Sequence, residues 1–337
     1  MREIGVITNP NSKKNRRHQR KLDDLRRIVG PRGLVRQTAT TEEIADVLRE
    51  FIDNGVRYWV SDGGDGALHW MLNEGRRALG ADFPLPLIVP TNGGTIDFVA
   101  QKAHVRGHAR SILQTIVRSE ERRTPFDVVE VDTMHLEGET LDGRPFDRIG
   151  FACAIAGVGQ NFFDKYYMDE LPGPQTILRI FGITIAGFFI KMTPLQHLPM
   201  ISPDFLNYPD DLFRAKPARV FIDGEEMPWR EYRAIHAGAI DIHLGNLKVF
   251  PLAAEPGRLN FHAGAVSPLD IVKNVPNLFA GRPIVADDFF DGGGEEMIVE
   301  ALGTETLDPV IDGELYHGLK RLRITPGPRV PVPRIQA

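Results

Sequence analysis

The first third of the chain alternates between short apolar runs and segments with apolar residues at helical spacing. One such segment has apolar residues at positions 44, 47, 48, 51 and 52, the single stripe of an amphipathic helix. We expect strands at residues 4–8, 34–38, 56–60 and 85–89, and helices at about residues 14–29, 44–52, 67–79, 96–101 and 108–119. This alternation predicts an α/β domain with a parallel sheet that helices cover on both faces.

The pattern changes near Thr124 and Pro125, where short β-like runs replace the alternation. The clearest of these runs lie at residues 127–131, 148–156, 218–222 and 258–262. A chain of 337 residues is long enough for two domains of roughly 150 residues each. We therefore expect an α/β domain over residues 1–124 and a β-rich domain over residues 125–318.

The most apolar stretch of the chain is residues 177–190. A helix of this length would span roughly 21 Å, which is short of the ~30 Å hydrocarbon core of a bilayer, so we do not expect it to cross a membrane. On a helical projection, its flanking and internal polar residues gather on one arc: Thr176, Arg179, Thr184 and Lys191. The remaining apolar surface belongs either to the core or to a face that contacts lipid.

The net charge and the cysteine content bear on two questions: whether the protein binds nucleic acid, and in which compartment it works. The net charge of −5 argues against a general nucleic-acid binder. The single cysteine, Cys153, rules out an internal disulfide and fits a reducing compartment, so we expect a cytoplasmic protein. Six basic residues lie within positions 13–21. They could attract ATP or an anionic membrane, although a solvated helix face is the simpler interpretation.

Three polar or glycine-rich loops follow expected strands, at residues 9–12, 63–66 and 93–98. Loops at the carboxyl ends of parallel strands are where α/β domains bind their ligands. The glycines of loop 63–66 let the backbone approach an anion, and the helix after it adds positive potential. Asp65 would suit a magnesium ion or a hydroxyl proton better than a phosphate. Taken alone, this loop could equally be a plain tight turn.

The loop sequences Asn-Pro-Asn-Ser at residues 9–12, Gly-Gly-Asp-Gly at 63–66 and Gly-Gly-Thr-Ile-Asp-Phe at 93–98 occur together with a late Asp-Gly-Glu at 312–314. In combination they resemble the diacylglycerol kinase catalytic-domain family, which includes sphingosine kinases and shares its fold with NAD kinases. The resemblance runs through most of the chain. It implies a nucleotide-binding α/β domain, a β-sandwich-like second domain, and closing strands at residues 319–337 that return to the first domain.

The resemblance also implies an ATP- and Mg²⁺-dependent kinase that phosphorylates a hydroxyl of diacylglycerol or a related lipid. Asp65 and Asp97 would hold Mg²⁺, and Asp312, with Glu314 beside it and Asp65 as the competing candidate, would be the general base. The residues that would line ATP are Asn9, Ser12, Gly63, Gly64, Asp65, Gly66, Gly94 and Thr95. The partners would be ATP, a lipid and an anionic membrane, which the protein would contact at the membrane's inner face. Whether the protein forms a homodimer is left open.

Several positions depart from the family pattern. Ala67 replaces the usual Thr after loop 63–66, Lys13 stands where Gly is frequent, and Ile96 stands where Asn is usual. Pro256 and Asn260 occupy acidic positions that hold a structural metal in bacterial members, so the sequence leaves open whether that metal is present here. These changes keep two alternatives in view, an NAD kinase-like enzyme and a non-catalytic protein that binds nucleotide or lipid.

Overall fold

The computed structural model describes residues 2–10, 21–170, 172–244 and 246–337, and the chain divides into two compact units. Unit 1 consists of Met1–Thr133 together with Gly327–Ala337. Unit 2 consists of Met134–Pro326. Each unit has its own sheets and its own helices.

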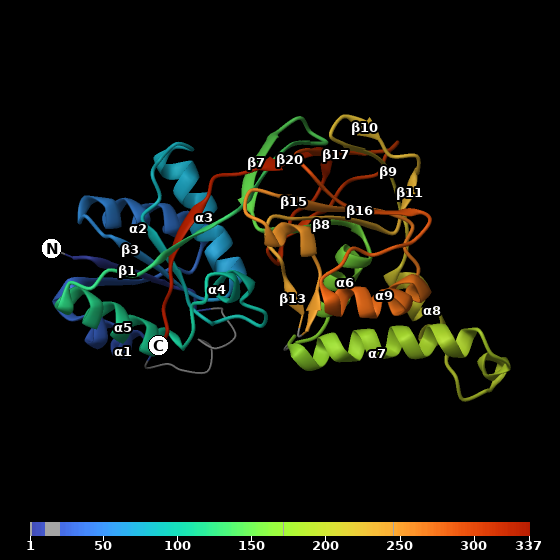
Figure 1. The fold of residues 1–337 in the computed structure, drawn as a ribbon, viewed down its shortest axis with the longest axis horizontal. Helices are drawn as coiled ribbons and strands as arrows, with labels where there is room; N and C mark the ends of the chain where they lie inside the picture. The colour runs from blue at the N-terminus through green and yellow to red at the C-terminus, as the bar shows by residue number, and fades with distance from the viewer. Residues whose placement is uncertain (1, 11–20, 171, 245) are drawn as a thin grey trace. The chain divides into compact units, whose positions relative to one another are not determined.

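Unit 1 is built on a four-stranded parallel sheet with the order β2-β1-β3-β4. The strands are β1 Ile4–Thr8, β2 Gly33–Gln37, β3 Tyr58–Asp62 and β4 Leu87–Pro90, with β5 Val128–Val131 and β21 Val330–Pro333 as a separate antiparallel pair. The helices are α1 Lys21–Val29, α2 Thr41–Asp53, α3 Asp65–Leu79, α4 Phe98–Lys102 and α5 Ala109–Arg122. Figure 1 shows α1 and α5 on one face of the parallel sheet and α2 and α3 on the other.

The order of the strands determines where unit 1 can bind a ligand. All five residues of β1 and all five of β3 are buried, as expected of central strands with helices on both faces. The chain passes from β1 to β2 on one side and then returns to β3 on the other side. Such a reversal opens a crevice at the carboxyl ends of β1 and β3, where open α/β sheets bind ligands.

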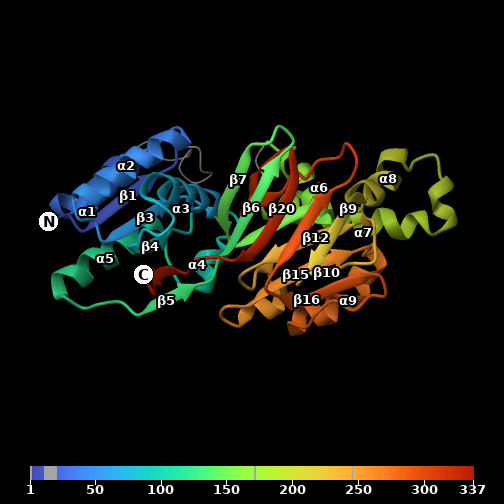
Figure 2. The ribbon, with the colours of Figure 1, turned by 90° about the horizontal axis from the view of Figure 1, so that it is seen from above.

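Unit 2 contains two antiparallel sheets. The first is seven-stranded, with the order β10-β9-β17-β20-β6-β7 and β11 paired to β9; the second is six-stranded, with the order β16-β15-β12-β8-β18-β19. The strands of the first are β6 Met134–Thr140, β7 Pro145–Gly150, β9 Lys216–Ile222, β10 Glu225–Glu226, β11 Glu231–Tyr232, β17 Met297–Ala301 and β20 Leu319–Pro326. Those of the second are β8 Ala152–Gly157, β12 Ala234–Gly238, β15 Leu259–Gly264, β16 Phe289–Gly294, β18 Val310–Ile311 and β19 Glu314–Leu315, and β13 His243–Leu244 and β14 Leu247–Lys248 form a small hairpin. Figure 2 shows β7, β6 and β20 side by side in the first sheet.

The helices of unit 2 cover one face of the six-stranded sheet (Figure 1). They are α6 Val158–Tyr167, α7 Pro174–Lys191, α8 Pro203–Leu212 and α9 Pro268–Ala280. One apolar cluster contains residues of both sheets, such as Leu136 and Phe261, and a second joins the helices to the six-stranded sheet through residues such as Ile180 and Phe289. Among the described helices, none combines the length and apolar character that crossing a membrane requires.

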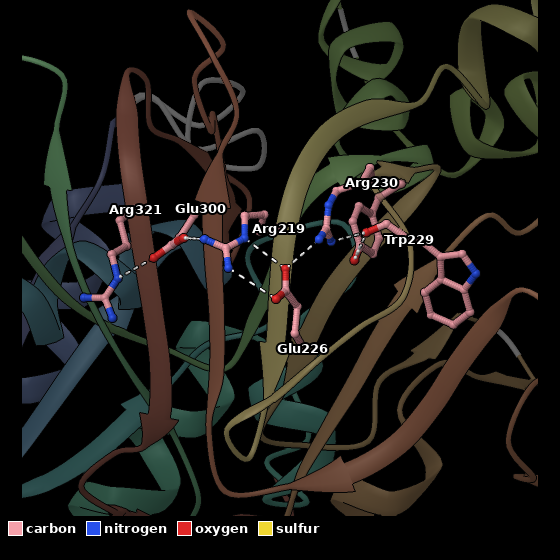
Figure 3. Close-up of polar contacts among 7 residues, drawn as sticks. Arg219, Glu226, Trp229, Arg230, Glu300 and Arg321 are labelled. Carbon is pink, nitrogen blue, oxygen red and sulfur yellow. Dashed lines mark hydrogen bonds and ion pairs between the residues drawn. The ribbon is translucent and has the colours of Figure 1, made fainter.

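The outer face of the seven-stranded sheet carries a ladder of alternating charges (Figure 3). Arg321 on β20 pairs with Glu300 on β17, which also pairs with Arg219 on β9 at 3.3 Å. Arg219 in turn pairs with Glu226 on β10, and Glu226 pairs with Arg230 at 2.9 Å. Exposed ion pairs of this kind contribute about 0–1 kcal/mol each to the stability of a protein. They add little to the stability of the sheet, but they show that this face of it is turned toward water.

The expected fold class is confirmed: a parallel α/β unit and a β-rich unit are both present. Several element bounds differ. The run expected at residues 148–156 is two strands, β7 and β8, and the helix expected at residues 96–101 is α4, which begins at Phe98. Of the segment 319–337 that was expected to return to the first domain, Leu319–Pro326 lies in the seven-stranded sheet of unit 2, and only Gly327–Ala337 lies in unit 1. The division into an ATP domain and a substrate domain stays a prediction.

Two neighbouring histidines in the six-stranded sheet, His236 and His262, should make the stability of the protein depend on pH. The Nε2 atom of His236 is buried without a hydrogen-bond partner among the described residues, and burial, with the neighbouring His262, lowers the pKa of His236 to about 3. The side chain is therefore neutral in the folded state, whereas the unfolded chain binds a proton below about pH 6.5.

The free energy of unfolding should fall as the pH drops from 6.5 toward 3, by up to about 1.4 kcal/mol per pH unit from this group. Other groups also titrate in this range, so the test compares the natural chain with a His236→Gln variant. Urea unfolding at pH 7 and pH 5 should show a smaller loss in the variant, by about 2 kcal/mol. An equal loss in both proteins would mean that His236 is not the sensitive group.

Candidate active site

The loops after β1, β3 and β4 meet at the carboxyl edge of the parallel sheet of unit 1. Asp62, the last residue of β3, is buried and joins the three strand ends. Its carboxylate accepts a hydrogen bond from Thr8 Oγ1 at 2.9 Å and a longer one from Thr91 Oγ1 at 3.4 Å. The backbone N–H of Asn9 also donates to the Asp62 carbonyl, at 3.4 Å. This carboxylate therefore helps to hold the loops in their places.

The two glycine loops after β3 and β4 pack backbone against backbone. A Cβ atom on Gly64 would lie 2.7 Å from the Cα of Gly94, and one on Gly93 would lie 2.4 Å from the carbonyl oxygen of Gly63. The N–H of Gly93 donates to that same carbonyl at 3.1 Å. Glycine is needed at these positions because any side chain would push the loops apart.

We predict that Gly93→Ala destabilises unit 1 by about 1–3 kcal/mol, the usual cost of overpacking, because the added methyl group meets backbone that cannot rotate away. Thermal unfolding should show the lower melting temperature. Gly75→Ala is the matched control, since Gly75 lies within α3 without a positive φ and its added Cβ would meet only ordinary contacts, such as Leu48 Cδ1 at 3.4 Å. Equal stability of the Gly93 variant and the natural chain would show that the loops can separate at no cost.

Asp65 and Asp97 both bind backbone N–H groups of this loop region. Asp65 Oδ2 accepts from the N–H of Phe98 at 3.2 Å, and Oδ1 accepts from the N–H of Val99 at 3.4 Å. Asp97 lies in the left-handed region, with φ of 54°, and its Oδ1 accepts from the N–H of Gly94 at 2.7 Å. Asp65 therefore ties the start of α3 to the start of α4, and Asp97 closes the loop after β4 on itself.

The N-terminus of α3 faces the same edge of the sheet. Gly64 is its N-cap and supplies no side-chain cap, and Asp65 and Gly66 occupy its first turn. A 15-residue helix that begins in this way has backbone N–H groups and a positive potential suited to an anion. Asn9 and Thr95 lie in the adjoining loops, whereas Ser12 lies outside the described residues, as does the basic run before Lys21.

In unit 2, Asp312 and Gly313 form the turn between β18 and β19, with φ of 52° and 90°. Asp312 is buried, and its Oδ1 accepts hydrogen bonds from the N–H groups of Phe151 at 2.9 Å and Ala152 at 3.0 Å. The side chain's other oxygen, Oδ2, lies 3.1 Å from the position that a Cβ on Gly150 would take. Asp312 therefore lies in a tight turn and not in extended backbone, with one oxygen of its carboxylate held by two backbone N–H groups.

Aromatic and basic side chains surround this turn. Tyr167 Oη donates to the carbonyl of Gly313 at 2.6 Å. Burial, with the nearby charge of Glu314, raises the pKa of Tyr167 to about 12, so its hydroxyl keeps its proton. Arg148 donates to Tyr316 Oη at 3.3 Å and lies over the Tyr316 ring. The turn is thus held by donors on both sides, with one carboxylate at its centre.

Asn260 occupies one of the two positions at which the sequence lacks the acidic residues of the structural metal site. This residue is buried; its side chain donates to Asp291 Oδ1 at 2.9 Å and accepts from the N–H of Leu252 at 3.1 Å. The amide therefore has hydrogen-bond partners of its own. Within the described ranges, no three His, Cys, Asp or Glu side chains gather in a manner suited to a metal ion.

Asp62 and Tyr167 are two residues of these sites that the sequence reasoning missed. Asp62 carried a usable signal, because an acidic residue that ends a strand beginning with Tyr-Trp-Val must find donors near the carboxyl edge. Tyr167 carried none, since its partner Gly313 lies 146 positions later in the chain.

Comparison with known proteins agrees with this geometry. Residues 3–131 match the family model of the diacylglycerol kinase catalytic domain, which confirms the resemblance noted in the sequence. No curated protein matches the chain. The match supports a phosphotransferase of the group that contains lipid kinases and NAD kinases.

Solved structures show the same fold. A diacylglycerol kinase from Bacillus anthracis str. Sterne is 15% identical, with a TM-score of 0.55 over 97% of this chain and 94% of that one. Another structure from the same organism gives a TM-score of 0.60 at 15% identity, over 96% and 94% of the two chains. Yeast NADH kinase complexed with NADH is 9% identical, with a TM-score of 0.53 over 99% and 84%.

Proposed function

We propose that this chain is an ATP-dependent lipid kinase that transfers a phosphoryl group to a hydroxyl of diacylglycerol or a related lipid. One observation carries the proposal. Two glycine loops and the uncapped N-terminus of α3 meet at the carboxyl edge of the parallel sheet, inside the region that matches the kinase catalytic domain. Phosphoryl transfer depends mostly on positioning and charge neutralisation, and these elements suit both.

In this proposal unit 1 holds the nucleotide. The N–H groups at the start of α3 bind phosphate oxygens, and Gly63, Gly64 and Gly94 leave space for a close approach of the backbone. Asn9, Ser12, Gly66 and Thr95 complete the set that we assign to ATP. Mg²⁺, when bound, would neutralise charge on the phosphates, and the carboxylates of Asp65 and Asp97 would hold it.

The general base is assigned to Asp312. A lipid alcohol is a weak nucleophile until a carboxylate accepts its proton. With Oδ1 bound to two backbone N–H groups, Oδ2 is the oxygen we assign to proton transfer. Glu314 is assigned a supporting role, because its charge acts on the neighbouring Tyr167.

Two other functions are weighed against this one. The likeness to yeast NADH kinase favours an NAD kinase-like enzyme as the second candidate. A non-catalytic protein is the third, because Ala67 and Ile96 depart from the family motifs. The presence of Asp65, Asp97 and Asp312 favours catalysis over binding alone.

We further propose that the protein acts in lipid metabolism, in the cytoplasm and in reversible contact with the inner face of a membrane. The single cysteine fits that compartment, and the basic run at residues 13–21 fits an anionic surface. A homodimer would be compatible with all of these roles.

The test is incubation of the full chain with Mg²⁺ and γ-labelled ATP in the presence of diacylglycerol, sphingosine or NAD. Organic extraction separates labelled lipid from labelled NAD phosphate. We expect label in the organic phase. Label in the aqueous NAD product alone would show that the protein is an NAD kinase. ATP binding without any labelled product would show that it is a non-catalytic nucleotide-binding protein.

A further inference from the structure

Large apolar side chains are exposed in unusual density between residues 167 and 200 of unit 2. Leu178 is 72% exposed, Met168 is 81% exposed and Met200 is 86% exposed. The other exposed members are Tyr167, Phe181, Ile185, Phe189, Met192, Leu195 and Leu198. Exposed apolar surface of this extent marks a place where a soluble protein meets a partner.

Helix α7 is inverted relative to an ordinary surface helix. Its buried stripe consists of Thr176, Ile180, Thr184 and Gly187, while its outer surface carries leucine, isoleucine and phenylalanine. The two threonines have partners inside the protein: Thr176 Oγ1 donates to Asp169 and Thr184 Oγ1 donates to the carbonyl of Ile180, both at 2.7 Å. The two threonines of the polar arc therefore face inward, Arg179 of that arc stays exposed, and the large apolar residues face outward.

The neighbouring helix α8 exposes mainly polar residues, in contrast to the apolar outer face of α7. It packs closely on α7, because a Cβ on Gly187 would lie 2.7 Å from the carbonyl oxygen of Phe205. The exposed residues of α8 are polar or acidic apart from Pro203: Asp204, Asn207, Asp210 and Asp211. One helix of this hairpin thus presents charge to water and the other presents hydrocarbon.

The cations of α7 are already paired within the hairpin region. Arg179 pairs with Asp169 at 3.2 Å, and Lys191 pairs with Asp210. Together with the acidic surface of α8, these pairs leave the hairpin without an excess of positive charge. Whatever covers α7 must therefore be attracted by apolar contact and not by opposite charge.

The apolar face is continuous with the turn that carries Asp312. Tyr167, which donates to the Gly313 carbonyl, stacks on Phe163 at 6.0 Å between ring centroids. Phe163 contacts Phe162 at 5.5 Å, and Phe162 stacks on Phe181 of α7 at 5.7 Å. A row of aromatic rings thus runs from the turn to the outer surface of α7.

We infer that the outer face of α7, with the segment from Met192 to Met200 that follows it, lies in the acyl layer of a lipid bilayer. The inference rests on the proposed function, and the aromatic row is the path along which a lipid's acyl chain would lead to its hydroxyl beside Asp312. A single amphipathic helix of this kind lies in the plane of the interface without crossing the bilayer.

Two features favour a bilayer over a second protein chain. Helix α7 is the outermost layer of unit 2 (Figure 1), and apolar side chains such as Leu178 and Ile185 are exposed on it. A protein partner would need a matching groove, whereas a fluid acyl layer needs none. Exposure also continues beyond the helix, through Leu195 and Leu198, and a fluid layer accommodates such an irregular edge.

The test is flotation of the full chain with vesicles of phosphatidylcholine alone and of phosphatidylcholine with phosphatidylglycerol, at low and high salt. The natural chain should bind the neutral vesicles, and high salt should change that binding little because charge does not drive it. A Leu178→Glu, Ile185→Glu double variant should bind them at least tenfold more weakly. Asn207→Glu is the control matched to Leu178→Glu alone, since each adds one negative charge to the hairpin; the control lies on the exposed polar helix and should bind as the natural chain does.

Binding to anionic vesicles alone, with loss at high salt, would overturn the inference and assign membrane contact to the basic run. Sedimentation of the natural chain as a dimer that the double variant dissociates would overturn it in favour of a second copy. Phosphorylation of a water-soluble short-chain diacylglycerol separates the two proposals: activity without flotation removes the docking surface only, and flotation without activity removes the kinase only.

Discussion

An Asp312→Asn variant is expected to lose about 100-fold or more in kcat while its affinity for ATP and its melting temperature stay close to those of the natural chain. Asparagine is an unusually clean substitution at this position. It tolerates the left-handed backbone that Asp312 adopts, at φ of 52°. Its single amide oxygen can also accept both of the hydrogen bonds that Asp312 Oδ1 accepts, from Phe151 and Ala152.

The substitution therefore removes the second oxygen and the negative charge, and little else. Kinetics at saturating ATP and lipid, with ATP affinity measured by calorimetry, provide the test. Asp312→Ala is the structural comparison: it leaves two backbone donors without their acceptor and should lower the free energy of unfolding by about 1–3 kcal/mol. A fall in kcat of less than tenfold for Asp312→Asn, or a loss of ATP binding, would contradict the assignment.

The sequence predicted most of unit 1 because its local signals agree with each other. Strands such as β1 and β3 are rich in apolar residues, and each is followed at once by glycine or asparagine. Since parallel strands place their carboxyl ends at one edge, the order of motifs along the chain was enough to bring loops 63–66 and 93–98 together. What could not be predicted was the tightness of that contact, which depends on Gly64 and Gly93 meeting the facing backbone.

Unit 2 was less predictable because its contacts join distant parts of the chain. Asp312 and Gly313 have the signature of a hairpin turn, and they do form one. The carboxylate's partners, Phe151 and Ala152, lie about 160 positions earlier, so nothing local indicated them. The prediction that all of residues 319–337 return to the first domain was wrong for residues 319–326, which form β20 in unit 2. The alternating apolar residues of β20 would suit a strand in either unit, so they did not indicate which sheet it joins.

Helix α7 shows a further limit of periodicity. The projection identified an arc with Thr176 and Thr184, but it could not decide which side faced the protein. Threonine on the inner side is tolerated because both hydroxyls donate hydrogen bonds within the unit. The direction of such a helix depends on these partners, which only the folded chain brings together.

Asp65→Asn should abolish most turnover for a different reason and should also cost stability. Each oxygen of Asp65 accepts from a different N–H, one from Phe98 and one from Val99. An asparagine can replace only one of these acceptors, so one donor at the start of α4 loses its partner, at a cost of about 1–3 kcal/mol.

Loss of the Asp65 charge should also weaken the binding of ATP with Mg²⁺, because a carboxylate is a preferred ligand of that ion. We expect the ATP affinity in the presence of Mg²⁺ to fall tenfold or more, to about the affinity measured with EDTA, together with a fall in kcat of about 100-fold. Calorimetry and kinetics well below the melting temperature separate this effect from unfolding. Gln101→Ala is the control for a loosened loop, since the Gln101 side chain donates to the carbonyl of Ile96 and carries no charge.

The two aspartate variants together decide the general base. If Asp65→Asn keeps its Mg²⁺-dependent ATP affinity and loses only kcat, while Asp312→Asn loses neither, then Asp65 takes the proton and Asp312 only holds its turn. If Asp65→Asn keeps both affinity and activity, loop 63–66 does not bind the phosphates, and the glycines serve only the contact between the two loops. The expected result is that Asp65→Asn lowers both the affinity for ATP with Mg²⁺ and kcat, whereas Asp312→Asn lowers kcat alone.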